Sequence, residues 1–235
     1  MKNPIPAQYA FTFTLYLLGS CLLALALVPA FLILFGLWEA LAPESTLTRA
    51  VVVAVSLGSG YFIFGLTLAA ETVILRYLLG LKLSEGEFVF FSAQGFKWAF
   101  VNAMMLIVNL TFMDFMRLTP LLPMYYRLMG AKIGKRVQIN TKGLADVSMI
   151  EIGDDTVLGG DAVVLGHLAE GGKLKLRKTR IGCNVTVGLG SVVMPGCQIG
   201  DGAMIAARSV LLKGTLVPPR ALFAGMPAKE IPRSS

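Results

Sequence analysis

Large apolar residues recur at every sixth position towards the C-terminal end of the chain. Over residues 181–223 all positions of this series are large and apolar, and small or β-branched residues stand two positions before each of them. Because side chains alternate along a strand, a period of six returns the same residue type to the inside of each short strand. This pattern predicts a parallel β-helix, in which each coil covers the apolar face of its neighbour. The apolar series is Ile181, Val187, Val193, Ile199, Ile205, Leu211, Val217 and Phe223, and the small series is Thr179, Val185, Ser191, Cys197, Ala203, Ser209, Thr215 and Ala221.

The same period extends towards the N-terminus, with two interruptions. It begins at Ile133 and Ile139, is irregular over residues 142–148, and resumes at Ile152, Leu158 and Val164. The next apolar position, Ile181, does not follow Val164 by a multiple of six, so a loop is expected to leave the coil between Leu165 and Arg180. A β-sandwich with evenly spaced strands is the alternative, but it would need alternation over longer strands.

Three apolar stretches precede the repeats. Residues 11–38 and 50–70 are almost free of charge and long enough to span a bilayer as helices. The third stretch, residues 98–116, carries polar residues that include Asn102 and Asp114. We therefore expect two spanning helices followed by a re-entrant or in-plane helix, and the alternative is three spans with the N-terminus outside.

Composition and charge support a membrane part. The chain of 235 residues is 55% hydrophobic and only 15% charged, with a mean hydropathy of +0.71. The net charge is +7, the loop between the first two stretches is acidic, and the flank after residue 116 is basic. Because positive charge gathers on the cytoplasmic side, the repeats are expected in the cytoplasm and the chain in the inner (plasma) membrane as a multi-pass protein.

These features predict an α + β chain with two domains. Residues 1–128 would form a membrane domain of transmembrane helices, and residues 129–235 would form the β-helix. The cysteines, Cys21, Cys183 and Cys197, have no framework spacing and are interpreted as buried thiols in a reducing compartment. The single histidine excludes a multi-histidine metal site, and we expect no metal and no nucleic-acid partner.

The repeats, together with the ending Ala224-Gly225-Met226-Pro227-Ala228-Lys229, resemble the hexapeptide-repeat acyltransferases. Met226 departs from the residue usual in that family. The resemblance covers about the last hundred residues. It implies left-handed coils of three hexapeptides and a homotrimer with each active site between two subunits. More loosely, the whole chain is similar to the membrane-spanning C-terminal region of poly-lysine-synthetase-like enzymes.

His167 is the candidate catalytic residue. Acyl transfer from a thioester needs a base that takes the proton of the attacking hydroxyl or amine, and an imidazole with an unperturbed pKa near about 6.5 suits this task. The resemblance implies the same role, because a histidine at such a loop is the base of the hexapeptide family and a His-Leu pair, here His167-Leu168, enters the loop of the synthetase-like enzymes. The alternative is a surface histidine in a turn.

Basic residues near the loop and on the last coils are candidate donor contacts. Lys178 and Arg180 belong to a basic run that also contains Lys173, Lys175 and Arg177. Such a run suits the phosphates of coenzyme A or of a phosphopantetheine arm, anionic lipid head groups, or a simple solvated face. The resemblance adds Arg208 and Lys213, because the family binds its donor along the groove between subunits near these coils.

Asp114 is a carboxylate in an apolar stretch. Acids inside a membrane are costly and often functional, yet Arg117 stands three residues later and a local ion pair explains Asp114 equally well.

The predicted function is acyl transfer, with acetyl-CoA as the donor that the resemblance favours. The acceptor would be an amine or a hydroxyl, on a lipid-linked or otherwise amphiphilic molecule. Two alternatives stay open: transfer of an acyl or aminoacyl group from the phosphopantetheine thioester of a carrier protein, and a non-catalytic trimeric scaffold. Membrane lipids, and in the first alternative a carrier protein, are the expected partners.

Overall fold

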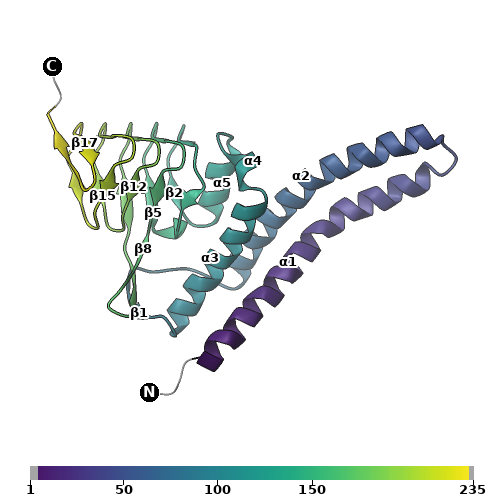
Figure 1. Cartoon of the computed structure of the whole chain (residues 1–235), viewed down its shortest axis with the longest axis horizontal. Coiled ribbons are helices and arrows are strands. Elements are labelled where there is room, and N and C mark those ends of the chain that lie inside the picture. The colour runs from purple at the N-terminus through teal and green to yellow at the C-terminus, as the bar shows by residue number, and fades with distance from the viewer. Residues whose placement is uncertain (1–4, 233–235) are drawn as a thin grey trace. The chain divides into compact units, whose positions relative to one another are not determined.

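The computed structural model describes residues 5–232, so the ends of the predicted domains, residues 1–4 and 233–235, lie outside the described residues. The chain divides into two compact units. The helical unit contains residues up to Tyr77 and residues 103–112, and the β-helix unit contains residues 78–102 and those from Met113 onwards. Residues 78–102 and 113–128, which the sequence analysis assigned to the membrane domain, therefore pack with the β-helix. Figure 1 shows the elements of both units.

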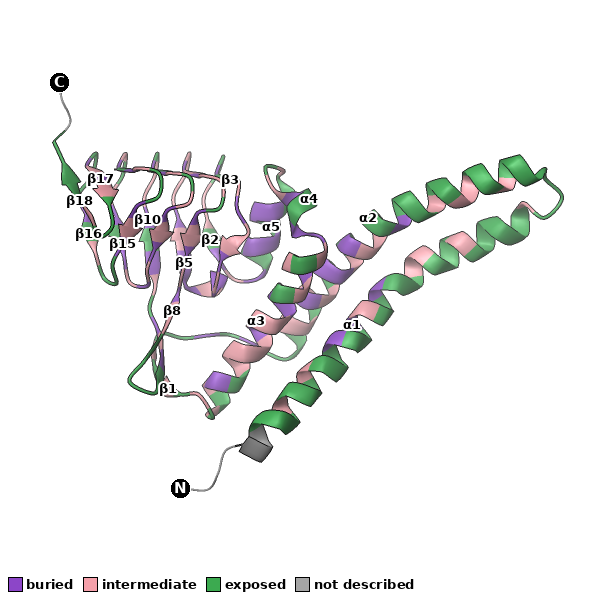
Figure 2. Ribbon diagram, viewed as in Figure 1, coloured by how far each residue is buried: buried purple, intermediate pink, exposed green. Residues whose placement is uncertain are grey.

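Two long helices dominate the helical unit, α1 (Ile5–Ala40) and α2 (Thr46–Leu78). Each contains 33 residues that are long enough and apolar enough to cross a membrane, and α3 (Ala93–Thr111) is not among such helices in the described part of the chain. Most of their side chains are exposed (Figure 2), among them Phe13, Leu32 and Val55. Apolar side chains left exposed along a whole helix suit a lipid environment better than water.

Glycines allow close packing inside the helical unit. A Cβ at Gly65 would meet the ring of Phe112 at 2.1 Å, and a Cβ at Gly60 would lie 3.5 Å from the Cβ of Ala30. The hydroxyl of Tyr61 also donates to the carbonyl of Thr111. The absence of a side chain at Gly60 and Gly65 therefore allows α2 to pack closely against α1 and against residues at the end of α3.

The predicted β-helix is present as three parallel sheets that share the coils (Figure 1). The first face contains β2 (Lys132–Ile133), β5 (Ile150–Ile152), β10 (Thr179–Ile181), β13 (Gln198–Ile199) and β16 (Leu216–Val217). The second contains β3 (Gln138–Ile139), β6 (Val157–Leu158), β11 (Thr186–Val187), β14 (Met204–Ile205), β17 (Leu222–Gly225) and the antiparallel β18 (Ala228–Ile231). The third contains β4 (Gly143–Leu144), β7 (Val163–Val164), β12 (Val192–Val193) and β15 (Val210–Leu211).

The register confirms the six-residue period. Ile181 pairs with Ile199, and Ile199 pairs with Val217, so every third apolar position stacks on the same face. The small positions are also inside, because Val185, Ser191 and Cys197 are fully buried. Apolar stacks of this kind bury each coil against the next and supply the core.

The first coil is covered by two short helices, α4 (Met113–Met116) and α5 (Leu121–Leu128). Arg127 of α5 donates from Nε to the carbonyl of Ile133 at 2.9 Å and from Nη2 to the carbonyl of Gly134. These bonds satisfy carbonyls at the open end of the solenoid, where no earlier coil is present to donate hydrogen bonds to them.

The predicted loop is an ordered hairpin. After β7 the chain forms β8 (His167–Glu170) and β9 (Lys173–Leu176), joined by Gly171 and Gly172 with positive φ. A further strand from the N-terminal half, β1 (Gly86–Val89), pairs antiparallel with β9. We call these three strands the appended sheet. Through it, a segment that lies some 90 residues earlier in the chain pairs with the hairpin.

The interpretation of the cysteines as buried thiols is only partly correct. Cys197 is buried in the core, Cys183 is half-buried, and Cys21 is exposed on α1, so the expectation is wrong for Cys21. The side chain of Cys21 lies on the outer surface of α1, and the uniformly apolar sequence of this helix did not show which of its sides is exposed.

Candidate active site

His167 stands where the chain leaves the third face of the solenoid. It is the first residue of β8 and follows Gly166, and its side chain is 28% exposed. A Cβ at Gly166 would lie 2.6 Å from the Cβ of Met149 and 2.9 Å from the Cβ of Asp146. Only glycine leaves room for the preceding coil at this point, so the turn brings the imidazole against Asp146.

Asp146 is the partner of His167. Its Oδ2 lies 2.5 Å from Nδ1 of His167, and the residue is fully buried. It adopts a left-handed conformation, with φ of 58°, directly before the short 3-10 helix η1 (Val147–Met149). Asp146 and the start of η1 lie in the irregular region that interrupts the repeat over residues 142–148. The irregular backbone turns the carboxylate of Asp146 towards the next coil.

Two side chains of α3 bind the other oxygen of Asp146. The indole Nε1 of Trp98 donates to Oδ1 at 2.6 Å, and Nδ2 of Asn102 donates to the same atom at 3.0 Å. Both residues lie in the part of α3 that belongs to the β-helix unit. Asp146 therefore accepts hydrogen bonds on both oxygens, as a buried carboxylate requires.

The network determines which ring nitrogen of His167 carries the proton. Indole N–H and amide N–H₂ groups only donate, so Oδ1 of Asp146 is an acceptor, and the carboxylate accepts from Nδ1–H of the imidazole through Oδ2. The neutral ring then has its lone pair on Nε2, which is the form that can take a proton from a substrate. The hydrogen bond to Asp146 raises the pKa of His167 above its usual value, burial opposes this, and the charge of Asp146 raises it further.

One side of the imidazole is covered by apolar groups. The ring of Trp98 lies 5.0 Å from the ring of His167 at an interplanar angle of 64°, and Phe90 packs edge to face with Trp98 at 6.3 Å. These rings join a core cluster formed by Leu83, Met149, Leu174 and Leu176. The accessible side of the His167 ring is therefore the side that Trp98 leaves open.

The appended sheet has two different faces, because side chains alternate along its strands. His167 pairs with Leu176, and Leu168 pairs with Lys175. The apolar face carries His167, Ala169, Leu174, Leu176 and Phe88, and the charged face carries Leu168, Glu170, Lys173, Lys175 and Glu87. The charged face borders a cavity of about 360 Å³ that Arg177 and Lys213 also line.

The candidate donor contacts are at three separate places. Lys178 and Arg180 both form ion pairs with Glu151, at 3.6 Å and 3.2 Å, on the first face. Lys213 binds Glu170 at 2.5 Å beside the cavity of the appended sheet. Arg208 is in a left-handed turn next to Gly190 at another corner of the solenoid. The structure thus brings Lys213 close to the hairpin that carries His167 and does not gather the four cations into one cluster.

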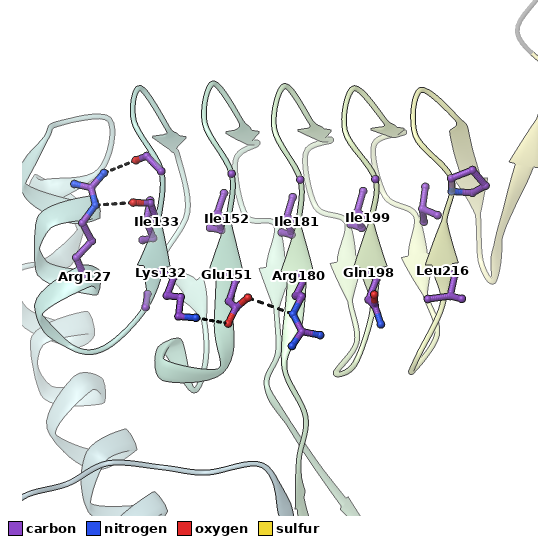
Figure 3. A pocket seen from close by; sticks show the side chains of 17 residues that line it. Arg127, Lys132, Ile133, Glu151, Ile152, Arg180, Ile181, Gln198, Ile199 and Leu216 are labelled. Carbon is purple, nitrogen blue, oxygen red and sulfur yellow. Dashed lines mark hydrogen bonds and ion pairs between the residues drawn. The ribbon is translucent and has the colours of Figure 1, made fainter.

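A cavity of about 920 Å³ follows the first face of the solenoid. Figure 3 shows a row of isoleucines along it, with Glu151 between Lys132 and Arg180. His167 is not among its lining residues. This groove is therefore separate from the site of the imidazole.

Asp114 has local partners. It forms ion pairs with Lys142 at 2.7 Å and with Arg117 at 3.3 Å, and Arg117 also lies 3.7 Å from Asp161. Hydrogen bonding to Lys142 lowers the pKa of Asp114. The ion-pair interpretation of Asp114 agrees with these contacts, which join α4 to the solenoid.

Sequence reasoning missed Asp146, Trp98 and Asn102. Asp146 lies in the irregular stretch of the repeat, 21 residues before His167, where no pattern singles it out. A sign of the other two was present, because Asn102 is a polar residue four positions after Trp98 in an apolar stretch, and residues with this spacing share a helix face.

In the described part of the chain, no group of three or more His, Cys, Asp or Glu side chains is arranged to hold a metal ion.

Comparisons with known proteins agree with the fold. The family described as Bacterial transferase hexapeptide (six repeats) matches residues 178–213. Delta-poly-L-ornithine synthetase of Acinetobacter baumannii is 26% identical over 117 residues, which are 50% of this chain and 9% of that protein. Galactoside O-acetyltransferase of Escherichia coli is 30% identical over 112 residues, 42% of this chain and 54% of that protein. A solved structure of a maltose O-acetyltransferase from Clostridium difficile matches 42% of this chain and 56% of that chain, at 30% identity and a TM-score of 0.38.

This chain spans about half the length of the galactoside O-acetyltransferase and 9% of the length of the synthetase. The matched residues, 178–213, lie within the parallel coils, and the pairing of coils continues after them at β16 and β17. The C-terminal solenoid is therefore similar to the hexapeptide-repeat acyltransferases.

Proposed function

We propose that the protein transfers an acyl group, most simply acetyl, from a coenzyme A thioester to an amine or hydroxyl, with His167 as the general base. The observation that carries this proposal is the hydrogen bond between His167 and the buried Asp146, which leaves Nε2 as a proton acceptor. The names of relatives support the acetyl group, since galactoside O-acetyltransferase is among them.

The proposed reaction has two proton transfers. The acceptor O–H or N–H gives its proton to Nε2 of His167 while the acceptor atom bonds to the thioester carbonyl carbon. The tetrahedral intermediate then collapses, the C–S bond breaks, and the thiolate takes the proton from the imidazolium. The carboxylate of Asp146 accepts the hydrogen bond from Nδ1–H and stabilises the imidazolium between the two steps. The products are the acetyl ester or amide and free coenzyme A.

In this proposal the donor phosphates bind at the cavity on the charged face of the hairpin, and the thioester end extends around the hairpin to His167 on the other face. Lys213 is the candidate cation nearest to the hairpin, and Lys175 and Arg177 line the same cavity. Glu170 now binds both Lys213 and Lys175, so phosphates of a donor would compete with this carboxylate. Arg208, Lys178 and Arg180 remain proposed contacts from other faces, which a neighbouring subunit would need to bring to the same donor.

A homotrimer is part of the proposal. Side chains on the outside of the last coils are apolar and exposed, notably Leu189, Leu212 and Leu216. Exposed apolar groups along the faces of a prism favour packing against copies of the same chain. A left-handed winding of the coils is the corresponding expectation from the resemblance.

Membrane attachment is proposed from α1 and α2, with the solenoid on the cytoplasmic side of the inner (plasma) membrane. Trp38 near the end of α1 has the guanidinium of Arg49 above its ring at 4.1 Å, as expected for a helix end in the interfacial region. Reporter fusions at Ser235 and in the loop between α1 and α2 test this topology. Activity of the Ser235 fusion only outside the inner membrane would contradict it.

A second candidate function uses a carrier protein as donor. The similarity to Delta-poly-L-ornithine synthetase favours it, because a protein with that name forms amide bonds between amino acids. The thioester would then be on a phosphopantetheine arm, and His167 would keep its role as base. Gene neighbours that encode a carrier protein would favour this donor over coenzyme A.

The test is turnover of acetyl-CoA by the full chain in detergent, followed by thiol release, with panels of amine and hydroxyl acceptors. His167→Ala should lower the rate by about 10²- to 10⁴-fold. Asp161→Asn, which removes an exposed carboxylate away from the imidazole, is the matched control and should retain activity. A rate for His167→Ala within about threefold of wild type, far less than the loss of a base, would favour the scaffold function.

A further inference from the structure

We infer that Trp98 and Asn102 of α3 are positioning residues that hold Asp146, and through it the imidazole of His167, in the orientation and charge state of a base. The inference rests on the proposed role of His167. It assigns a function at the site to a helix that precedes the solenoid and that the family repeats do not include.

The first argument is the orientation of the carboxylate. Rotation about the Cβ–Cγ bond of aspartate is soft, so the side chain alone does not keep Oδ2 towards His167. Two donors at 2.6 Å and 3.0 Å hold Oδ1 on the α3 side, which turns Oδ2 towards Nδ1. Without them a fully buried oxygen would lose both partners, which is costly.

The second argument is that the two donors are held in place within α3 by their own contacts. Trp98 and Asn102 are four residues apart and share a helix face, and Nδ2 of Asn102 donates both to the carbonyl of Trp98 at 2.9 Å and to Asp146. Both partners of Nδ2 are acceptors, so the orientation of the amide is determined by its bonds. The indole also packs against the core cluster and, edge to face, against Phe90.

The third argument concerns charge. Hydrogen bonds from α3 share the negative charge of Asp146 and so limit how tightly Asp146 retains the proton on His167. Asp146 is the charged group bonded to the imidazole from the solenoid, and α3 contributes only the neutral donors Trp98 and Asn102 there. The charged residues of the appended sheet, Glu87, Glu170, Lys173 and Lys175, are on its other face, and Arg177 pairs with Glu87.

Removing the donors should therefore change the titration of His167 in a definite direction. A carboxylate with fewer donors attracts the imidazolium proton more strongly, so the midpoint of the coupled pair moves to higher pH. The rate near neutral pH falls, because a smaller fraction of His167 is free to act as a base. A side chain that only filled space would alter stability without moving this midpoint.

The chain contains a single histidine, which makes a direct measurement possible. The full chain, labelled with ¹⁵N-histidine and purified through a tag without histidine, is titrated by NMR in detergent. In the wild type we expect a midpoint above about 6.5 and a neutral form protonated on Nδ1. Trp98→Phe and Asn102→Leu should each raise the midpoint, by about half a unit or more.

Phe90→Leu is the matched control, because it removes packing against Trp98 but no hydrogen bond to Asp146. It should leave both the midpoint and the tautomer unchanged. An unchanged or lowered midpoint in both Trp98→Phe and Asn102→Leu would overturn the inference. Asn102→Leu keeps the volume of the side chain, so it decides the question if Trp98→Phe does not fold.

The NMR measurement does not depend on turnover. Shifted titrations in the two variants together with an inactive wild type would contradict the proposed function while supporting the positioning of His167. Normal titrations in the two variants together with full wild-type turnover would contradict the positioning alone.

Discussion

The carboxylate of Asp146 and the imidazole of His167 come from consecutive coils of the solenoid and meet at 2.5 Å, although 21 residues separate them in the chain. The coils are parallel, so residues at the same corner of two turns become neighbours. The corner is also the place where the hairpin leaves the repeat, which opens one side of the imidazole.

Asp146→Asn should weaken the base. The amide keeps the shape of the side chain but removes the charge and the acceptor that raise the pKa of His167, so the acid limb of the pH–rate profile should move to lower pH. The loss of orientation should lower the maximal rate by about 10- to 10³-fold. Steady-state rates from pH 5 to 9 measure both effects.

Asp155→Asn is the control for that experiment, because Asp155 pairs with Arg136 at an exposed corner far along the coil from His167. It should reproduce the wild-type profile. An Asp146→Asn profile with the wild-type midpoint would show that Asp146 does not act on the charge of His167.

Stability should depend on pH through His167. Its pKa in the folded state is raised above about 6.5, so the folded state binds this proton more tightly than the unfolded state. The resulting stabilisation is fully present below about pH 6.5 and is lost as the pH rises through the raised pKa. The melting temperature of wild type should therefore exceed that of His167→Gln by more at pH 6 than at pH 9.

The comparison between these two proteins cancels the titration of all other groups that they share. A gap in melting temperature that stays constant, or that widens towards alkaline pH, would contradict the ion pair with Asp146.

Gly166→Ala should displace the residues that position His167. The new Cβ would meet Met149 at 2.6 Å and Asp146 at 2.9 Å, so the preceding coil has to move. We expect a loss of about 1–3 kcal/mol in stability and of about 10²-fold in rate from misplacement of the base. Gly160→Ala is the control, since its nearest neighbour would be 3.5 Å away; equal effects of the two substitutions would argue against a special role for Gly166.

Gly65→Ala should loosen the helical unit. Its Cβ would overlap the ring of Phe112 at 2.1 Å, whereas a Cβ at Gly58 would meet no atom within 4 Å. Thermal unfolding in detergent should therefore show a lower melting temperature for Gly65→Ala than for Gly58→Ala. Identical melting temperatures would mean that α2 and the end of α3 do not pack closely in the protein.

The full chain should be a trimer in detergent. Native mass spectrometry or light scattering tests the mass, and Leu212→Glu, which places a charge on the exposed apolar surface, should weaken the assembly. Lys229→Glu, outside that apolar surface, serves as the control. A stable and active monomer would rule out an active site shared between subunits.

The sequence by itself determined the solenoid, its start, and both of its interruptions. The six-residue period records which side chains face inward, and that choice is local, because each short strand must bury its own apolar residue. That three repeats make one coil, so that Ile181, Ile199 and Val217 stack, was implied by the resemblance and is confirmed by the register. The single histidine at the second interruption was visible for the same reason, as a polar residue where the pattern fails.

Only the tertiary structure decided what surrounds that histidine. Asp146 is 21 residues from His167, and Trp98 is 48 residues from Asp146, and no period in the chain connects these positions. Their meeting depends on how far an irregular coil shifts the backbone and on where α3 packs, which are properties of the whole unit and not of any segment. A buried carboxylate must find donors, and the fold alone shows that it finds them on a helix outside the repeats.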